Sequence, residues 1–267
     1  MSAIVMDPGA SAVVVAPEQA LDRASLNLAN ALLGNAGEAA GLEVLVGGLR
    51  LRFVTGSAVA VSGAEGMVKL NGSELPLNKA VRVAPGAMLE FGPALFGIRY
   101  YLAVQGGMEP QSDALTTGRT LTFGPPNGHT FPAVTRTARR ALDRERPVVA
   151  RVEPGPDVEK YDAATWLRLT TEPWTLSPES DRAGARLVGR SLHPADGPAQ
   201  GFHEAGEAPQ ARPLVTGSVL LPPSGLPIIA LAGHPATGSS PVIAVVRDED
   251  LDALGQARPG QMVHLLR

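Results

Sequence analysis

The chain has 267 residues, of which 44% are hydrophobic and 18% charged, and its net charge at pH 7 is -3. This length suits one large β-rich domain or two lobes of ordinary size. The charge balance supplies no basic field for nucleic acid or anionic lipid, and the absence of cysteine excludes disulfides, thiolate zinc sites and a cysteine nucleophile. We therefore expect a protein that binds neither nucleic acid nor a membrane.

The first residues do not predict a membrane signal or anchor. They lack a basic flank before their short apolar run, and no run in the chain reaches the about 18 apolar residues that a membrane-spanning helix needs. We expect a soluble, cytoplasmic protein.

From Leu21 to Leu33 the apolar residues recur at helical spacing, with Asp22 placed to cap the helix and Gly34 to end it.

Past this helix the pattern changes to short alternating or apolar runs bounded by Gly, Pro or Asn, which is typical of strands. Such runs occupy residues 42–56, 57–63, 67–72, 80–92 and 96–107. Residues 109–147 contain several glycines and prolines and an Arg-rich piece without alternation. This stretch is predicted to be a long connection.

Strand signals resume in the second half of the chain, around a proline- and glycine-rich loop from His193 to Arg212. They lie at residues 147–155, 166–170, 185–189, 217–225 and 259–266. Asp248 predicts a short helix that ends at Gly255. Two helices among many glycine-bounded strands favour β-barrel or sandwich lobes over alternating βα units. We expect a mostly β protein with lobes at residues 1–150 and 151–267.

The spacing of the histidines does not indicate a metal site. The five histidines, at positions 129, 193, 203, 234 and 264, form neither an HxH nor an HExxH pair. The sequence also lacks a GxSxG nucleophile elbow and a GxxxxGK[ST] phosphate loop. We therefore expect no metal or nucleotide cofactor on this chain, and no ATPase activity of its own.

The best candidate site is the loop at residues 233–240, which separates the apolar runs 226–232 and 241–246. It offers backbone N–H groups, one imidazole and three hydroxyls, from His234, Thr237, Ser239 and Ser240. Groups of this kind bind carboxylates and stabilise oxyanions. A loop between buried strands is also often only a turn of small residues, and that alternative stays open.

Two charged residues are further candidates. Arg182 follows Asp181 just before an apolar run, where its guanidinium could clamp a carboxylate through two hydrogen bonds. In the alternative, Asp181 accepts backbone N–H groups of a turn and Arg182 is solvated. Glu43 lies within an apolar run, so its carboxylate is either poised for a ligand or paired structurally, and pairing is the commoner arrangement.

Five blocks of the sequence occur in an order that resembles one known family. They are residues 20–48, 98–107 (IRYYLAVQGG), 155–157 (GPD), 180–189 (SDRAGARLVG) and 217–260, the last with Pro-Pro-x-Gly, Thr-Gly and Gln-x-Arg-Pro-Gly elements. Together they resemble the family of the 5-oxoprolinase C-type subunit, which includes allophanate hydrolase subunit 2, KipA-like proteins and biotin-dependent carboxyltransferase domains. The blocks cover most of the chain from about residue 20 onward.

The resemblance implies cyclophilin-like β-barrel lobes and a complex with a KipI-like, B-type partner and an A-type partner. It implies cleavage of an amide such as 5-oxoproline, with ATP used by the partner subunits, or transfer of a carboxyl group from biotin to urea. On this hypothesis His234 and Thr237 are catalytic. The substrate, a small carboxylate or amide, is expected to bind Arg182, Gly238, Ser239, Ser240 and Glu43. We also expect the Arg182 turn to meet the 233–240 loop.

The sequence departs from the family pattern in four places, one of which is TTGRT at 116–120 in place of a Gly-Ser-x-Ser-Thr segment. No counterpart of the family's N-terminal strand and Gly-Arg-x-Gly turn precedes Val15, and the barrel edge left by that strand should be covered by a partner or a second copy. The loop reads GHPATGSS where the family has Asp-His-Gln-Thr-Thr-Gly-Gly-Tyr, and Leu220 replaces a Gln. The lost polar groups favour an alternative, a non-catalytic KipA-like regulatory or binding protein. A plain ligand-binding barrel is a third possibility.

Overall fold

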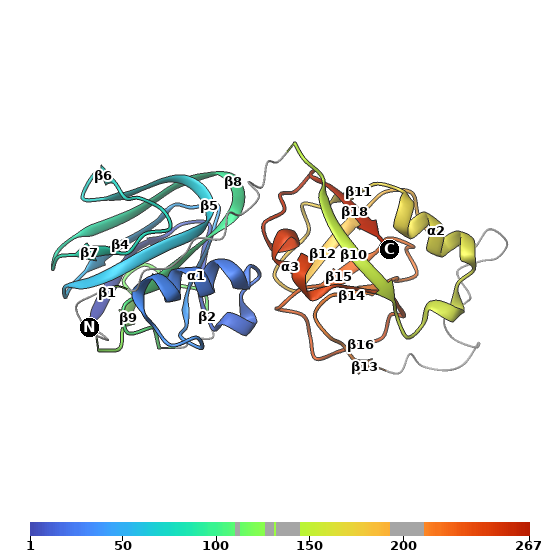
Figure 1. Cartoon of the computed structure of the whole chain (residues 1–267), viewed down its shortest axis with the longest axis horizontal. Helices are drawn as coiled ribbons and strands as arrows, with labels where there is room; N and C mark the ends of the chain where they lie inside the picture. Colours follow the sequence, from blue (N-terminus) through green and yellow to red (C-terminus); the bar gives the residue numbers. More distant parts are fainter. Residues whose placement is uncertain (110–112, 126–130, 132–144, 193–210) are drawn as a thin grey trace. The chain divides into compact units, whose positions relative to one another are not determined.

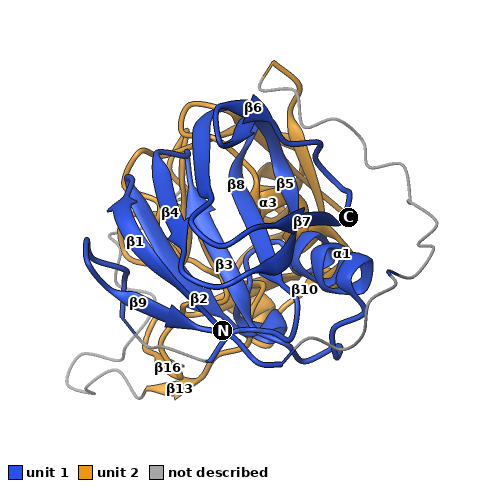
Figure 2. Ribbon diagram, turned by 90° about the vertical axis from the view of Figure 1, so that its left-hand side faces the viewer, with its two compact units in different colours: residues 1–143 blue, residues 144–267 orange. Residues whose placement is uncertain are grey.

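The computed structural model describes residues 1–109, 113–125, 131, 145–192 and 211–267. The chain divides into two compact units, Met1–Asp143 and Arg144–Arg267 (Figure 2). Both units consist mainly of β-strands. The described residues form three α-helices, α1 (Arg23–Leu33), α2 (Ala163–Thr171) and α3 (Asp248–Gly255). The prediction of a mostly β protein with a few short helices is confirmed.

Unit 1 contains a nine-stranded antiparallel sheet (Figure 1). Six strands lie in the order β2-β3-β8-β4-β1-β9, and β5 pairs with β6, β7 and β8. The strands are β1 (Ser2–Pro8), β2 (Ser11–Val15), β3 (Gly41–Leu45), β4 (Leu49–Phe53), β5 (Ser57–Leu70), β6 (Ser73–Glu74), β7 (Val81–Val83), β8 (Met88–Val104) and β9 (Thr120–Thr122). Their alternate side chains form the main core of the unit, in which Phe53, Leu89 and Tyr100 are fully buried.

The N-terminal segment forms two strands, so the expectation that an N-terminal strand is missing is wrong, although the family's Gly-Arg-x-Gly turn has no counterpart there. β1 lies between β4 and β9, with Ile4 opposite Arg52 on one side and Thr120 on the other. Ala3 and Val5 are fully buried, since every second side chain of this strand points into the core and the others point outward. The barrel edge that a missing strand would have left is therefore occupied by the chain's own β1, and the expected assembly through that edge loses its basis.

β5 and β8 are longer than the sequence predicted, because several glycines lie inside these strands and do not end them. The β5–β8 register shifts around Gly63, Glu65 and Gly66, so the glycines mark irregularities of the kind that bend long strands. A Cβ on Gly66 would lie 2.0 Å from the hydroxyl of Tyr100 and 2.4 Å from the carbonyl oxygen of Pro93. A side chain at position 66 would therefore push the two strands apart.

Helix α1 begins and ends where the sequence predicted. The Asp22 carboxylate accepts a hydrogen bond from Ser25 N at 3.0 Å, and Gly34 ends the helix with φ of 68°, a conformation that glycine adopts without strain. The helix packs against β5 and β8 (Figure 1). This contact is made mainly by alanines, and its fully or almost fully buried members are Ala29, Leu33, Ala58, Ala60 and Ala103.

Unit 2 contains a closed barrel of seven strands in the order β10-β17-β14-β15-β12-β11-β18. β10 pairs in parallel with β18, with Val148 opposite Val263, and this pair closes the barrel. The strands are β10 (Val148–Pro154), β11 (Trp174–Leu176), β12 (Gly184–Val188), β14 (Ser218–Leu220), β15 (Ile228–Ala230), β17 (Val242–Val246) and β18 (Met262–Leu266). A separate ladder pairs β13 (Arg212–Pro213) with β16 (Thr237–Gly238).

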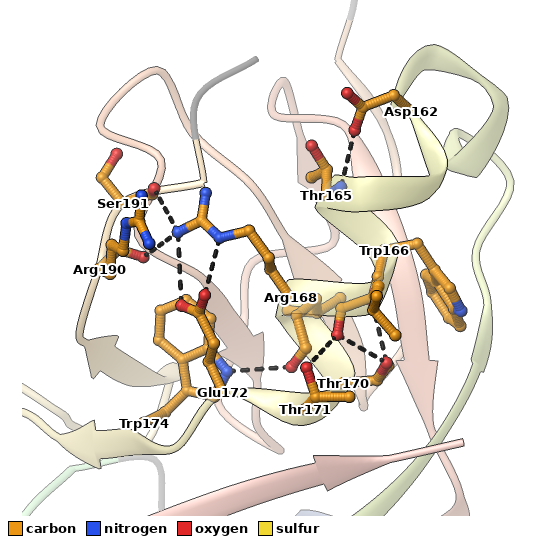
Figure 3. Close-up of polar contacts among 12 residues, drawn as sticks. Asp162, Thr165, Trp166, Arg168, Thr170, Thr171, Glu172, Trp174, Arg190 and Ser191 are labelled. Carbon is orange, nitrogen blue, oxygen red and sulfur yellow. Dashed lines mark hydrogen bonds and ion pairs between the residues drawn. The ribbon is translucent and has the colours of Figure 1, made fainter. Parts of the chain in front are cut away.

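Residues 166–170 form part of helix α2, so the strand predicted there is wrong. The run WLRLT alternates like a strand, but Asp162 caps the N-terminus by accepting a hydrogen bond from Thr165 N at 2.7 Å. The helix is also held at its C-terminal end (Figure 3), where Arg168 donates to Glu172 Oε1 at 2.9 Å and to the carbonyl oxygen of Ser191 at 3.0 Å. A short apolar run is compatible with both the helical and the strand period, and here the Asp162 cap favours the helix.

Helix α3 covers the residues that the sequence predicted, and Arg151 of β10 holds it. The Asp250 carboxylate accepts hydrogen bonds from Arg151 Nε and Nη2, both at 2.8 Å, and these bonds lower the pKa of Asp250. None of the helices in the described residues is both long and apolar enough to cross a membrane.

Candidate functional site

The Arg182 turn is held by the side chain of the residue before it and the backbone of the residues after it. Asp181 accepts hydrogen bonds from Ala183 N at 2.8 Å and Gly184 N at 2.9 Å. This is the turn arrangement that the sequence left open as an alternative for Asp181. Arg182, between these anchors, is half-buried, so the turn fixes its backbone while part of its side chain reaches solvent.

The structure brings the Arg182 turn and the 233–240 loop together. β12 pairs with β15, Gly184 opposite Ala230, so the residues before β12 and after β15 lie at the same end of the barrel. Gly233 N donates to the carbonyl oxygen of Arg182 at 2.8 Å. A Cβ on Gly233 would lie 2.9 Å from that oxygen and 3.1 Å from the Cβ of Arg182. The contact therefore depends on glycine at position 233.

We expect Gly233→Ala to lower the stability of unit 2 by about 1–3 kcal/mol, because the added methyl overpacks against the Arg182 backbone. Trp166 and Trp174 both lie in unit 2, so denaturant unfolding followed by intrinsic fluorescence measures this unit. The midpoint of the variant is compared with that of the parent chain. An unchanged midpoint would contradict the tight contact at Gly233.

His234 is the second residue of the loop, and its ring is already oriented. Its Nδ1 lies 2.7 Å from the carbonyl oxygen of Pro235. A carbonyl oxygen only accepts, so Nδ1 carries the hydrogen, and the neutral ring presents the lone pair of Nε2. The side chain is half-buried. This arrangement provides a hydrogen-bond acceptor or proton acceptor beside the Arg182 turn.

Thr237 and Gly238 lie farther along the loop, in β16. They pair with Pro213 and Arg212 of β13. β15 and β17 are both antiparallel to β14, so the end of β15 and the start of β17 lie at opposite ends of the barrel. The loop therefore begins beside Arg182 and runs to the other end. Ser239 is exposed and Ser240 is half-buried in the last part of this path.

Glu43 belongs to unit 1, whereas the other predicted site residues belong to unit 2. Its carboxylate has an exposed fraction of 3% and accepts hydrogen bonds from Leu21 N at 3.1 Å and the Tyr101 hydroxyl at 2.8 Å. Arg99 lies 3.4 Å from its other oxygen. Burial, followed by the nearby Glu43 and Asp22 carboxylates, raises the pKa of Tyr101 well above its usual value, so the hydroxyl keeps its proton. This geometry fits structural pairing, and substrate binding by Glu43 stays a prediction.

Within the described ranges, no three His, Asp or Glu side chains gather closely enough to hold a metal ion. His129, His193 and His203 lie outside the described residues, as do residues 136–144 of the Arg-rich piece and residues 193–210 of the long loop.

The sequence did not identify two charged residues next to the loop. Asp157, at the end of the GPD block, is 4% exposed, and its Oδ1 accepts a hydrogen bond from Arg212 at 2.8 Å. Its Oδ2 accepts from Val242 N at 2.9 Å. The available signal was the carboxylate that ends the GPD block. Arg212 gave no signal, because it stood at the end of a polar loop.

Comparison with known proteins decides the family. The model of the carboxyltransferase domain, subdomains A and B, matches residues 15–267. The chain belongs to this family. The predicted family resemblance is thereby confirmed.

Among members of the carboxyltransferase domain family, the C-type subunit of 5-oxoprolinase from Haemophilus influenzae is 31% identical over 256 aligned residues, covering 91% of this chain and 80% of that protein. Urea amidolyase of Lachancea kluyveri is 24% identical over 284 aligned residues, covering 94% of this chain but 15% of that protein. The crystal structure of Kluyveromyces lactis urea carboxylase has the same fold, with a TM-score of 0.84 at 22% identity over 99% of this chain and 27% of that one. The chain thus spans a small part of these two larger proteins.

Proposed function

We propose that this carboxyltransferase-family chain acts as the C-type subunit of a 5-oxoprolinase-like complex, which cleaves a cyclic amide while ATP is consumed by the partner subunits. One observation carries the proposal. The match to the C-type subunit of 5-oxoprolinase covers 80% of that protein, whereas the match to urea amidolyase covers 15%. The chain corresponds to nearly the whole of a separate subunit, and the proposed partners are subunits of the A and B types.

The groups in unit 2 suit the two ends of such a substrate. Hydrolysis of a ring amide adds water across the C–N bond, so the carbonyl carbon gains oxygen and the nitrogen gains hydrogen. In the proposed role Arg182 binds the substrate carboxylate, and Nε2 of His234 accepts a proton from water or passes it to the nitrogen. In the same role the Thr237 hydroxyl, farther along the loop, donates to the amide oxygen. The N–H of Gly238 pairs with the carbonyl oxygen of Arg212 in the β13–β16 ladder and so holds this part of the loop, while Ser239 and Ser240 lie toward the opposite end of the barrel.

Reconstitution tests this function directly. The chain is purified alone and together with the A- and B-type subunits of the same organism, and ATP-dependent conversion of 5-oxoproline to glutamate is measured. We expect turnover only when all subunits are present, and no ATP hydrolysis by the chain alone. A complete, stable complex that converts neither 5-oxoproline nor related cyclic amides would contradict the proposal. Carboxyl transfer from a biotinylated carrier to urea serves as the second assay.

A second candidate is a non-catalytic regulatory or binding subunit. It is favoured by the loss of polar groups at family positions, namely the Asp, Gln and Tyr replaced in the GHPATGSS loop and the Gln replaced by Leu220. On this alternative the chain binds its B-type partner and changes the partner's activity without turning over an amide. Complex formation with no turnover in either assay would favour it.

A further inference from the structure

Asp157 is a buried carboxylate in unit 2 that binds three elements at once. Oδ1 accepts hydrogen bonds from Arg212 of β13 at 2.8 Å and from Lys160 at 2.7 Å. Oδ2 accepts from Val242 N, the first residue of β17, at 2.9 Å, and the backbone N–H of Asp157 donates to the carbonyl oxygen of Val242 at 3.0 Å. One side chain thus joins the turn after β10 to β13 and to the start of β17.

These contacts enclose the second half of the 233–240 loop. Arg212 lies opposite Gly238 in the β13–β16 ladder, and Leu214 N donates to the carbonyl oxygen of Ala236 at 2.9 Å. Val242 follows the last loop residue by two positions. Asp157 therefore holds both the strand that pairs with Thr237 and Gly238 and the point at which the loop enters the barrel.

The turn that carries Asp157 is itself fixed against β17. Gly155 N donates to the carbonyl oxygen of Ile243 at 2.9 Å, and a Cβ at position 155 would lie 2.4 Å from the carbonyl oxygen of Val242. The turn therefore lies directly on the strand, with no room for a side chain between them. Because the turn and β17 cannot shift independently, a side chain fixed on this turn also fixes the part of the loop that it contacts.

Both carboxylate oxygens and the charge are needed for this anchor. Burial would raise the pKa of Asp157, but hydrogen bonds from Lys160, Val242 N and Arg212 outweigh it and lower the pKa, so the group is ionised at neutral pH. An asparagine has the same shape but only one acceptor oxygen. That oxygen can accept from Lys160 and Arg212 or from Val242 N, but not from both sides. The NH₂ group then faces the remaining donors and cannot accept a hydrogen bond from them.

We infer that Asp157 is a positioning residue, which holds Thr237 and Gly238 in place through Arg212 and Val242 without touching the substrate. The inference rests on the proposed function for the importance of that loop. The anchoring itself concerns this chain alone.

The test compares Asp157→Asn with the control variant Asp162→Asn. Asp162 is exposed and lies five residues away, and an asparagine there can still accept the capping hydrogen bond from Thr165 N. Hydrogen exchange is measured by mass spectrometry on peptides that contain Leu214 and residues 236–242. We expect exchange in these peptides to become about ten- to a hundredfold faster in Asp157→Asn and to stay unchanged in the control. The double variant Asp157→Asn with Arg212→Gln should exchange no faster than Asp157→Asn, since both act through one contact.

Activity in the reconstituted complex separates positioning from simple structural support. We expect Asp157→Asn to lower kcat about tenfold or more with a smaller change in KM, because the loop is misplaced while Arg182 still binds substrate. Unchanged exchange, or faster exchange with unchanged kcat in an active complex, would overturn the inference. An inactive parent complex would instead refute the proposed function, and the exchange result would then decide alone whether Asp157 anchors the loop.

Discussion

Replacing Glu43 with alanine should lower the free energy of unfolding of unit 1 by about 3–5 kcal/mol, because one partner of a buried charged network is removed. The carboxylate is 3% exposed and accepts from Leu21 N and from the Tyr101 hydroxyl. Without it these two donors lose their acceptor, and the side chain of Arg99, only 11% exposed, loses a counter-charge. Deleting a buried acceptor costs the desolvation of every donor left behind, so this effect exceeds that of losing a surface ion pair.

The matched control is Glu90→Ala. Glu90 pairs with Arg50 at 3.1 Å, but the two side chains are 35% and 51% exposed, so we expect a change below about 1 kcal/mol. Hydrogen exchange of peptides from α1 and β3 measures unit 1 specifically, since both tryptophans lie in unit 2. The network would prove unimportant for stability if both glutamate variants unfolded within about 1 kcal/mol of the parent.

Replacing His234 with alanine should lower kcat of the reconstituted complex by about a hundredfold or more, which is the usual contribution of a general acid or base. The bond from Nδ1 to the Pro235 carbonyl already fixes the tautomer, so the ring needs no reorientation before Nε2 accepts a proton. The loss should therefore appear mainly in kcat.

Two further variants make this second prediction specific. His264→Ala is the control, since His264 is also half-buried in unit 2 but lies in β18, and its removal should leave the activity nearly unchanged. His234→Asn keeps a donor near the position of Nδ1 but cannot exchange a proton. If Asn restores activity, the imidazole only orients the loop. Full activity of His234→Ala would remove His234 from the proposed mechanism.

Much of the fold could be predicted because local signals and tertiary structure agree. Asp22 and Gly34 mark the ends of α1 correctly, since capping depends on neighbouring residues alone. Glycines were less reliable. Gly63 and Gly66 suggested strand ends, yet they allow one long strand to bend through close contacts that involve Tyr100, more than 30 residues away. Such contacts are not visible in a local pattern.

The candidate site shows the same limit more strongly. The Arg182 turn and the loop at Gly233 could be proposed as neighbours only from the family resemblance, because their contact depends on the pairing of β12 with β15. Asp157 and Arg212 were missed because they are 55 residues apart and join only when the barrel has formed. Residues whose importance comes from a long-range partner leave no periodic or motif signal in the sequence.

The parallel pairing of β10 with β18 has a consequence for the order of folding during synthesis. The described strands of unit 1 all lie before residue 123, so that sheet can form while the rest of the chain is still being made. The barrel of unit 2 cannot close during synthesis, because its first strand, β10, pairs with residues 262–266, which are made last. Until those residues leave the ribosome, the apolar faces of β10 and β17 lack their full covering. We therefore expect the nascent second half to be the part of the chain that depends on chaperones, since pairing of such distant strands is slow.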